Sequence, residues 1–286
     1  MDKWVDLHTH SSFSDGSLTP SALVAAAQEA GLAALALTDH DTCGGVEELL
    51  AAGEASPIET AAGVEVSVEF HGRTVHVLGY GIDPTHERLC AALLRIVDGR
   101  NDRNVRIIRK LQMLGIRIDL EDVEALAGEQ VIGRPHIAQV LVQKGVVGSF
   151  EEAFARYLGR GQPGYCERFR LEPEAAIALI AEAGGLAVLA HPSYMNITSP
   201  DALAATLDRL KQAGLAGIEA YYTDHTEEQT RLYLEMAEQF DLLVTGGTDF
   251  HGSIKPGVAL GWGRGSLRVP YVLFERLRDA MQHRER

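Results

Sequence analysis

Histidines and carboxylates recur at the ends of the apolar segments in this 286-residue chain. Six residues share that placement: His8, His10, His40, His191, Asp249 and His251. His8 and His10 lie two residues apart, so on an extended backbone both side chains point to one face. Such a pair could hold one divalent ion, for which imidazole and carboxylate groups are common ligands.

Three further residues extend this set of donors. Asp15 lies in SFSDGS, Glu65 in AAGVEVS and His76 in TVHVLGYG, which brings the candidate ligands to nine. One ion takes at most about six such ligands. We therefore expect at least two metal ions and expect three, with Glu65 as the natural bridging carboxylate. The nitrogen and oxygen donors favour manganese, iron or zinc and do not narrow the choice further. We expect manganese, with iron or zinc as the other candidates.

The alternative is that these histidines are structural. A single histidine at a strand end is usually a hydrogen-bonded structural residue, because buried polar groups find partners. Here, however, H-x-H, D-H-D, H-P and D-x-H follow four different apolar segments of one chain. A purely structural explanation would need four coincidences, so we interpret the set as a metal centre.

The elements that position these residues alternate between two patterns. Apolar, β-branched segments predict strands at residues 4–8, 32–38, 60–68, 74–82, 185–191, 217–222 and 242–247. Capped amphipathic segments predict helices at residues 19–31, 172–185, 199–214 and 226–240. Repeated strand–helix units favour a parallel sheet or barrel. In α/β barrels the carboxyl ends of the strands form the active-site face, where these histidines would meet.

One stretch interrupts the alternation. Residues 99–170 show helical periodicity without a strand, and we predict a helical insertion domain there, with residues 1–98 and 171–286 forming the α/β barrel domain. The stretch is richer in arginine than its surroundings, with Arg100, Arg103, Arg106, Arg109, Arg117, Arg134, Arg156, Arg160, Arg168 and Arg170.

Composition limits the class of partner. The net charge of −14 repels polyanions at long range, so we expect no duplex DNA partner, whereas a short nucleotide gripped by metal ions and arginines stays compatible. No apolar run approaches the ~18 residues of a membrane span, and the N-terminal segment lacks the features of an export signal. We expect a cytoplasmic protein without a membrane partner.

The motifs DLHTHSSFSDG, ALTDHDT, GVEVS, HVLGYG, AHP and GTDFHG resemble, in order, those of the polymerase and histidinol phosphatase (PHP) family of amidohydrolase-like proteins. The resemblance implies a distorted seven-stranded (β/α) barrel and a trinuclear metal centre. It groups His8, His10, Glu65 and Asp249 around one ion, Glu65, His76 and His191 around a second, and Asp15, His40 and His251 around a third. No ligand departs from the family pattern, which argues against an inactive, metal-free member.

The segment GRPH, residues 133–136, is similar to a motif of the PHP subgroup that contains nucleoside 3′,5′-bisphosphate phosphatases and 5′-3′ exoribonucleases. Arg134 offers a planar, permanently charged fork suited to a phosphate, and His136 lies two residues later. The alternative is an ordinary helix start with Pro135 at its first position, which we would prefer without the resemblance.

A second candidate for substrate binding lies earlier in the insertion. Arg100, Asn101 and Arg103 in DGRNDRNVR could face the mouth of the barrel. An ordinary charged helix face explains this segment equally well.

These features suggest a phosphoesterase mechanism as a hypothesis. A metal-activated hydroxide would attack phosphorus in line with the leaving oxygen. Arg134 would neutralise charge, and His136 or a water would protonate the leaving group. Glu65 and Asp249 would complete the catalytic centre.

The subgroup resemblance implies removal of the 3′-phosphate from nucleoside 3′,5′-bisphosphates, and release of 5′-nucleotides from short 5′-phosphorylated RNA. One alternative is hydrolysis of histidinol phosphate or another small phosphomonoester. The other is a non-catalytic, metal-stabilised binding module.

Overall fold

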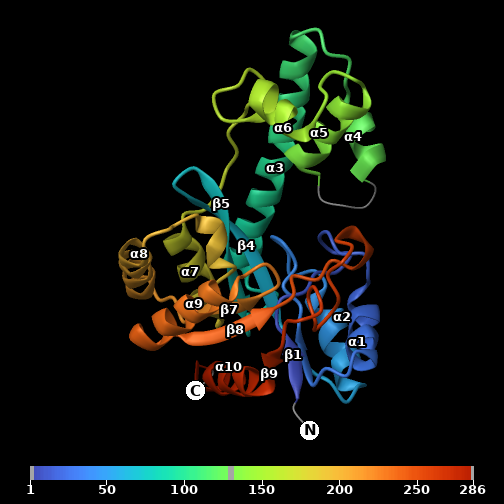
Figure 1. Cartoon of the computed structure of the whole chain (residues 1–286). Coiled ribbons are helices and arrows are strands. Elements are labelled where there is room, and N and C mark those ends of the chain that lie inside the picture. The colour runs from blue at the N-terminus through green and yellow to red at the C-terminus, as the bar shows by residue number, and fades with distance from the viewer. Residues whose placement is uncertain (1–2, 128–131, 285–286) are drawn as a thin grey trace. The chain divides into compact units, whose positions relative to one another are not determined.

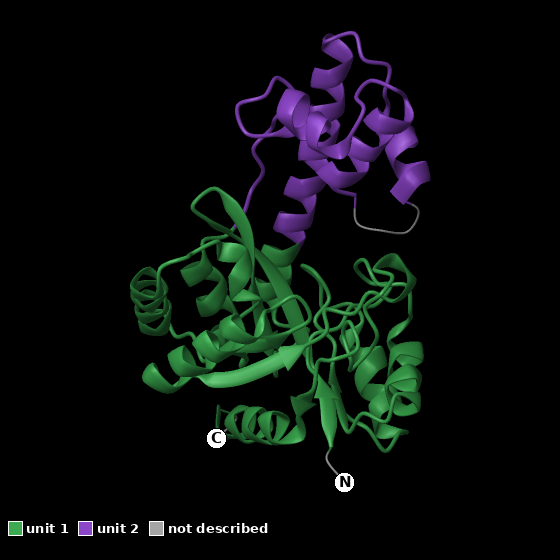
Figure 2. Ribbon diagram, viewed as in Figure 1, with its two compact units in different colours: residues 1–93, 171–286 green, residues 94–170 purple. Residues whose placement is uncertain are grey.

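The computed structural model describes residues 3–127 and 132–284 of the chain. The chain divides into two compact units (Figure 2). Unit 1 comprises Met1–Leu93 and Leu171–Arg286, and unit 2 comprises Leu94–Arg170. Strands and helices both contribute to unit 1, so the fold is of the mixed α/β class.

Unit 1 contains two sheets among its described residues. The first has the strand order β3 (Glu59–Ala61), β2 (Ala34–Ala36), β1 (Trp4–Asp6) and β9 (Val269–Pro270). The second has the order β4 (Gly63–Phe70), β5 (Arg73–Tyr80), β6 (Leu186–Leu189), β7 (Gly217–Tyr222) and β8 (Leu243–Gly247). Strands β1, β2 and β3 are parallel to one another, and so are β6, β7 and β8. The carboxyl ends of both parallel sets therefore carry the segments in which most candidate ligands lie.

The alternation of strands and helices predicted parallel strands throughout, but some neighbouring strands are antiparallel. Strands β4 and β5 form an antiparallel hairpin, and β5 is antiparallel to β6. Only His71 and Gly72 connect β4 to β5, with φ angles of 48° and 79°. Two successive positive φ angles match the tight hairpin turn whose twist fits the flanking strands. A two-residue connection cannot make the long crossover that parallel neighbours need.

Backbone hydrogen bonds also connect the two sheets. The Leu7 amide donates to the carbonyl of Gly246 at 3.1 Å, which links the end of β1 to β8. At the other side, the Glu65 amide donates to Asp39 at 3.0 Å and the Asp41 amide donates to Glu65 at 2.9 Å. These bonds hold the segment after β2 against β4.

Helices surround the sheets of unit 1 (Figure 1). They are α1 (Pro20–Glu29), α2 (Val46–Glu54), α7 (Pro173–Glu182), α8 (Pro200–Gln212), α9 (Glu227–Gln239) and α10 (Tyr271–Arg284), with short 3-10 turns η2 (Pro192–Met195) and η3 (Gly252–Ile254). The four predicted helices coincide with α1, α7, α8 and α9, whereas α2 and α10 have no counterpart among the predicted elements.

Local sequence explains where three of these helices begin. The side chains of Thr19, Ser199 and Thr226 accept hydrogen bonds from backbone amides in the first turns of α1, α8 and α9. Pro20 and Pro200 follow two of these caps, where the missing amide hydrogen costs nothing. Apolar side chains of α10, including Phe274 and Leu277, pack into the same buried cluster as strand residues of both sheets.

Unit 2 is helical in the part that the structure describes. It contains most of α3 (Glu87–Met113), together with α4 (Leu120–Ala127), α5 (Arg134–Gln143), α6 (Phe150–Ala153) and the π-helical turn η1 (Phe154–Leu158). Its own apolar core includes Ile107, Leu111, Val123, Leu141 and Leu158. The predicted division into residues 1–98 with 171–286 and residues 99–170 stays a prediction of domain organisation.

None of the described helices is long and apolar enough to cross a membrane.

Candidate metal centre

The nine predicted ligands lie in unit 1 and gather around one carboxylate. Oε1 of Glu65 is 2.8 Å from His76 Nδ1 and 2.9 Å from His191 Nε2. Its Oε2 is 3.2 Å from His8 Nε2, 3.2 Å from His10 Nε2 and 3.0 Å from His40 Nδ1. Five imidazoles from four different segments therefore surround a carboxylate that has no solvent exposure.

Asp249 lies on the same cluster from the segment after β8. Its Oδ1 is 3.1 Å from His10 Nε2 and 3.6 Å from His8 Nε2. Together with Glu65 these residues form one group whose ligand atoms all lie within 4.8 Å of one another. That is the set of four that the family resemblance placed around a single ion.

Two further groups have the same spacing. One contains His10, Asp15, His40 and His251, and the other contains His40, Glu65 and His76. The expected sets differ slightly, because they placed His191 with Glu65 and His76. His191 is nevertheless adjacent, since its Nε2 is 3.3 Å from His76 Nδ1. How the ligands divide among individual ions stays a prediction.

His191 Nε2 is hydrogen-bonded to Glu65 Oε1 at 2.9 Å, but other ligand atoms of the cluster lie close together without a hydrogen bond. Among the described residues, His8 Nε2, both ring nitrogens of His10, His40 Nδ1 and Glu65 Oε2 are buried without a hydrogen-bond partner. Buried polar atoms without partners are rare in native proteins. Two ligands bound at about 2.1 Å to one ion, at right angles, lie roughly 3.0 Å apart. The observed separations of 2.8 to 3.6 Å therefore fit atoms that share divalent ions.

The charges of the cluster alter the pKa values of its members. Burial opposes ionisation of Glu65, but the surrounding histidines, His40 first, hold the pKa of its carboxyl well below the ordinary value. Burial likewise opposes protonation of His10, but the carboxylates of Asp249 and Glu65 raise its pKa to about 10. The ionised carboxylates of the site thus stabilise positive charge at the neighbouring imidazoles. Bound protons or bound metal ions can both provide that charge.

Two candidate ligands lie at strained backbone positions. His191 has φ 25° and ψ 68°, and Asp249 has φ 56°. Such conformations cost roughly 1–3 kcal/mol in residues other than glycine and are concentrated at functional sites. The His191 amide donates to Glu219 Oε2 at 2.7 Å, and the Asp249 amide donates to the His8 carbonyl at 2.9 Å. These bonds hold both side chains toward the cluster.

Glu219 is a site residue that the sequence analysis missed. It lies in β7 with no solvent exposure, and its Oε1 is 2.9 Å from His8 Nδ1. A carboxylate on the outer nitrogen fixes the tautomer of a metal-binding histidine, so that the other nitrogen faces the ion. The signal was available, because Glu219 is the one charged residue in the otherwise apolar segment GIEAYY.

Tyr222 and Lys255 also escaped prediction. Both side chains donate to Oδ2 of Asp249, the hydroxyl at 2.9 Å and the ammonium at 2.8 Å. The two oxygens of Asp249 therefore have different neighbours: Oδ1 faces the histidines, and Oδ2 accepts hydrogen bonds from Tyr222 and Lys255. Only the fold brings Lys255, in the loop that follows η3, back to this carboxylate.

Gly247 packs closely against the backbone of the metal-ligand candidate His8, and this contact can be tested by substitution. A Cβ at Gly247 would lie 2.3 Å from the His8 amide nitrogen and 2.4 Å from His8 Cβ. Overpacking of this kind typically costs about 1–3 kcal/mol. Gly247→Ala is therefore expected to lower the melting temperature and to displace His8, reducing bound metal measured by elemental analysis.

Gly148→Ala is the control for this experiment. A Cβ at Gly148 would meet only the flexible end of Glu152, at 3.4 Å. If Gly247→Ala melted and bound metal like the control, the close packing of Gly247 against His8 would have no role in the site.

The predicted substrate-binding residues all lie in unit 2. Arg134 begins α5, where its Nη1 donates to the Leu158 carbonyl at 3.3 Å and its guanidinium lies 5.7 Å from the ring centre of Tyr165. His136 Nδ1 accepts a hydrogen bond from the Gly133 amide at 3.1 Å. GRPH therefore does start a helix, which does not exclude a role in binding phosphate.

The residues of the second predicted patch lie on α3. Arg100 and Arg103 are buried, with exposures of 8% and 5%, whereas Asn101 is exposed. Burial, followed by the positive charges of Arg168 and Arg134, lowers the pKa of Arg103 to about 9. Such crowding of buried guanidinium groups is costly unless anions compensate it. Contact of these residues with a substrate stays a prediction.

Curated proteins resemble this chain over most of its length. A 5′-3′ exoribonuclease from Haemophilus influenzae is 38% identical, with 88% of this chain and 91% of the relative covered. A 3′,5′-nucleoside bisphosphate phosphatase from Chromobacterium violaceum is 36% identical, with 90% of each chain covered. A phosphoribosyl 1,2-cyclic phosphate 1,2-diphosphodiesterase from Eggerthella lenta is 32% identical, with 94% and 97% covered.

Solved structures show the same likeness. An amidohydrolase from Chromobacterium violaceum, solved with bound sulfate and no metal, has a TM-score of 0.76 and 35% identity over 90% of this chain and 89% of its own. A Bifidobacterium adolescentis protein, described as a metal-dependent phosphoesterase, has a TM-score of 0.78 and 31% identity over 96% and 95%. The PHP domain model matches residues 6–132. The chain therefore belongs to the PHP family.

Proposed function

We propose that the protein is a metal-dependent phosphoesterase that removes the 3′-phosphate of nucleoside 3′,5′-bisphosphates and releases 5′-nucleotides from short 5′-phosphorylated RNA. The observation that carries this proposal is the buried Glu65 carboxylate, which has five histidine nitrogens within 3.2 Å. The substrate class rests on the relatives from Haemophilus influenzae and Chromobacterium violaceum.

Two or three divalent ions fit the donor set. We assign their binding to His8, His10, Asp15, His40, Glu65, His76, His191, Asp249 and His251, with manganese preferred over iron or zinc. Nitrogen and oxygen donors without thiolates suit all three metals. When bound, such ions lower the pKa of water toward ~7 and neutralise phosphate charge.

The protein residues then have separate roles. Glu65 and Asp249 form the catalytic centre with the histidines, and Tyr222 and Lys255 fix the orientation of Asp249 through its Oδ2. A fixed carboxylate needs no reorganisation during the reaction, which is how preorganised sites lower a barrier.

Unit 2 supplies the proposed substrate contacts. We assign the 5′-phosphate to Arg134, with Arg100, Asn101 and Arg103 as further contacts. Arginine suits this role because its guanidinium can donate two parallel hydrogen bonds to a phosphate. His136 is the candidate for protonating the leaving oxygen. Because its Nδ1 accepts from Gly133, Nε2 would carry that proton.

We also propose that the two sheets of unit 1 form one distorted barrel of seven strands, namely β1, β2, β4, β5, β6, β7 and β8. Its support is the pair of junctions described above, between Leu7 and Gly246 on one side and between Glu65 and the segment after β2 on the other. Closure of that kind would place all the predicted ligands at one end of the barrel.

The experiment that tests the function uses metal-stripped protein and adenosine 3′,5′-bisphosphate. Manganese, iron, zinc and magnesium are added back separately, and phosphate and 5′-AMP are measured. Release of phosphate together with 5′-AMP would establish both the metal requirement and the position of cleavage. The absence of turnover with every metal would refute the nucleotide function.

The relative from Eggerthella lenta supports a second candidate, hydrolysis of a cyclic phosphodiester, because it covers almost the whole chain. Phosphoribosyl 1,2-cyclic phosphate and histidinol phosphate therefore belong in the same assay. A higher kcat/KM on either would make that compound class the substrate. Metal-dependent melting without turnover of any phosphoester would instead indicate a binding module.

A further inference from the structure

We propose that the exposed face of α3 in unit 2 binds the backbone of single-stranded RNA. This basic face consists of Arg95, Arg106, Arg109 and Lys110, with Tyr165 and Phe169 beside it. The choice of RNA as ligand rests on the proposed exoribonuclease activity, whereas the surface itself is argued from charge and shape.

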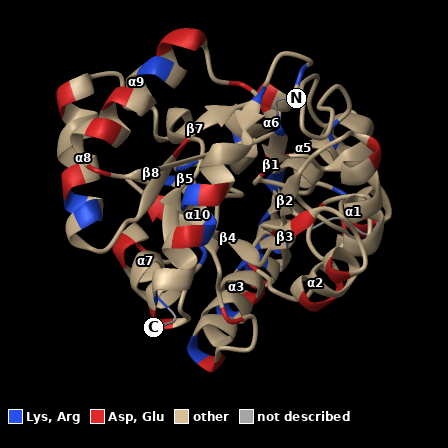
Figure 3. Cartoon of the chain, turned by 90° about the horizontal axis from the view of Figure 1, so that it is seen from below, with Lys and Arg blue, Asp and Glu red and all other residues tan. Residues whose placement is uncertain are grey.

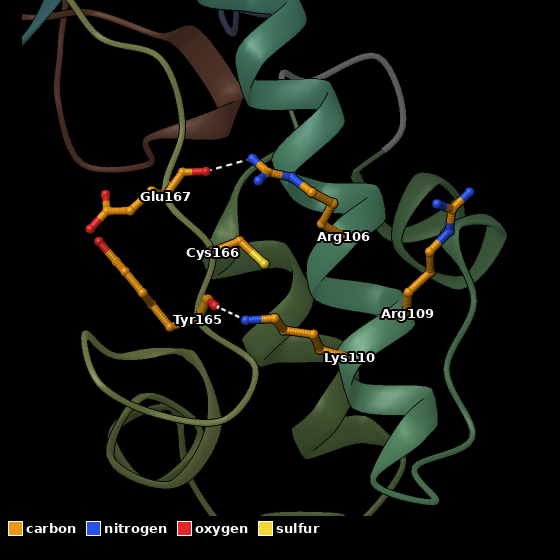
Figure 4. A pocket seen from close by; sticks show the side chains of 6 residues that line it. All are labelled: Arg106, Arg109, Lys110, Tyr165, Cys166 and Glu167. Atoms are coloured by element: carbon orange, nitrogen blue, oxygen red, sulfur yellow. Dashed lines mark hydrogen bonds between the residues drawn. The ribbon is translucent and has the colours of Figure 1, made fainter.

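Two adjacent hollows lie along this face. One, of about 410 Å³, is lined by Arg106, Arg109, Lys110, Tyr165, Cys166 and Glu167 (Figure 4). The other, of about 430 Å³, is lined by Gly99, Asp102, Val105, Arg106, Arg109 and Phe169. Arg106 and Arg109 line both hollows, so the hollows are neighbours. From Gly99 to Lys110 the helix rises about 16 Å, so the face suits an extended ligand better than one small anion.

The cations of the hollows have no carboxylate partner within 4.0 Å among the described residues. Arg106 Nη2 donates to the Glu167 carbonyl at 2.5 Å, and Lys110 Nζ donates to the Tyr165 carbonyl at 2.6 Å. Arg109 points away from both carbonyls (Figure 4). The Glu167 carboxylate lies on the side of the Tyr165 hydroxyl, away from α3 (Figure 4). The neutral carbonyls position two of these cations without cancelling their charge.

Charge is distributed unevenly between the two units. Residues 94–170 contain 13 Lys and Arg against 10 Asp and Glu, a net charge of +3, and the remainder of the chain carries −17. Acidic residues of unit 1 lie along helices such as α8 and α9 (Figure 3). A basic surface on an acidic protein attracts polyanions locally while the rest of the molecule repels them.

Aromatic groups favour a single strand over a duplex. Tyr165 and Phe169 are half-buried beside the basic residues, and the Arg95 guanidinium lies 3.9 Å from the ring centre of Phe169. Aromatic rings and guanidinium planes are surfaces on which unpaired bases stack. The bases of a duplex are already stacked on each other, so a duplex could use only the charges.

The test compares two charge-matched double variants. Arg106→Gln/Arg109→Gln removes two cations of the basic face. Lys144→Gln/Arg156→Gln removes two cations of unit 2 that pair with Asp122 at 2.7 Å and Glu152 at 2.6 Å. Binding of 3′-labelled oligouridylates of two to ten nucleotides to metal-stripped protein is followed by fluorescence anisotropy at several salt concentrations.

We expect the basic-face variant to bind decamers about tenfold more weakly, and dinucleotides as tightly as the unaltered protein. The slope of log K against log salt should become shallower by about 1.4, since each phosphate contact contributes ~0.7 for single strands. The control variant should change neither quantity. Arg109→Gln alone, which removes no hydrogen bond of the described structure, should give about half the change in slope.

Equal weakening by both double variants, or no weakening by either, would overturn the proposal. A competition experiment gives a further contrary outcome. If an acidic peptide of equal charge displaced the decamer as effectively as unlabelled RNA, a protein partner would fit the face better and the proposal would be overturned. Turnover of adenosine 3′,5′-bisphosphate is measured separately. Its absence would refute the proposed function, whereas the binding comparison would still decide the role of this surface.

Discussion

Replacing Glu65 with Gln is expected to lower kcat for phosphoester hydrolysis by about 10³-fold, which corresponds to roughly 4 kcal/mol. The substitution keeps the shape of the side chain but removes the negative charge at the point where five histidine nitrogens converge. A neutral amide cannot bridge two cations, and its NH₂ group cannot act as a ligand. Bound metal should therefore fall together with activity.

Elemental analysis and steady-state kinetics measure both effects. Glu235→Gln is the matched control, because Glu235 is exposed on α9 and should change neither metal content nor kcat. Circular dichroism of Glu65→Gln is the check that this variant keeps the fold. Full activity with a full complement of metal would show that Glu65 is not a bridging ligand, and the grouping of the site would have to be revised.

Replacing Arg134 with Ala is expected to lower kcat/KM on adenosine 3′,5′-bisphosphate by about 10- to 100-fold, while 3′-AMP loses little. A charge-assisted hydrogen bond to phosphate contributes about 1.5–3 kcal/mol, and only the bisphosphate carries a 5′-phosphate for Arg134 to contact. Arg134→Lys should recover part of the loss, because an ammonium keeps the charge but not the planar fork.

The comparison between the two substrates also controls for structural damage. Arg134 donates to the Leu158 carbonyl, so its loss could loosen unit 2. Damage of that kind would affect both substrates alike. Arg156→Ala provides a second control, since Arg156 is exposed and paired with Glu152. An equal loss on 3′-AMP and on the bisphosphate would remove Arg134 from 5′-phosphate recognition.

The regular elements were largely predictable because their signals are local. Thr19 and Pro20 mark a helix start by chemistry that acts within one turn, and α1 begins there. The hairpin of β4 and β5 was predicted as two strands but not as an antiparallel pair. Its direction depends on a two-residue turn with positive φ angles at both His71 and Gly72, and residues other than glycine adopt such angles in only a few per cent of cases.

The candidate ligands were recognisable because metal chemistry restricts the choice of residue. Imidazole and carboxylate groups at strand ends need only their position in the sequence to be noticed, as for His8, His10 and Asp249. Glu219, Tyr222 and Lys255 were missed because each acts through another side chain. A glutamate within a strand or a lysine in a loop has many ordinary explanations, and only the contact identifies it.

The sequence by itself determined that the chain is an α/β protein with a cluster of nitrogen and oxygen donors and an arginine-rich helical insertion. Those properties follow from residue type, period and spacing, which are local. Only the tertiary structure decided that five histidine nitrogens lie within 3.2 Å of Glu65 and that Lys255 donates to Asp249. It also decided that Arg106, Arg109 and Lys110 have no carboxylate partner within 4.0 Å among the described residues. Each of these depends on how the folded chain places the side chains in space, because the strength of a charge or hydrogen bond is set by distance and burial rather than by order along the chain.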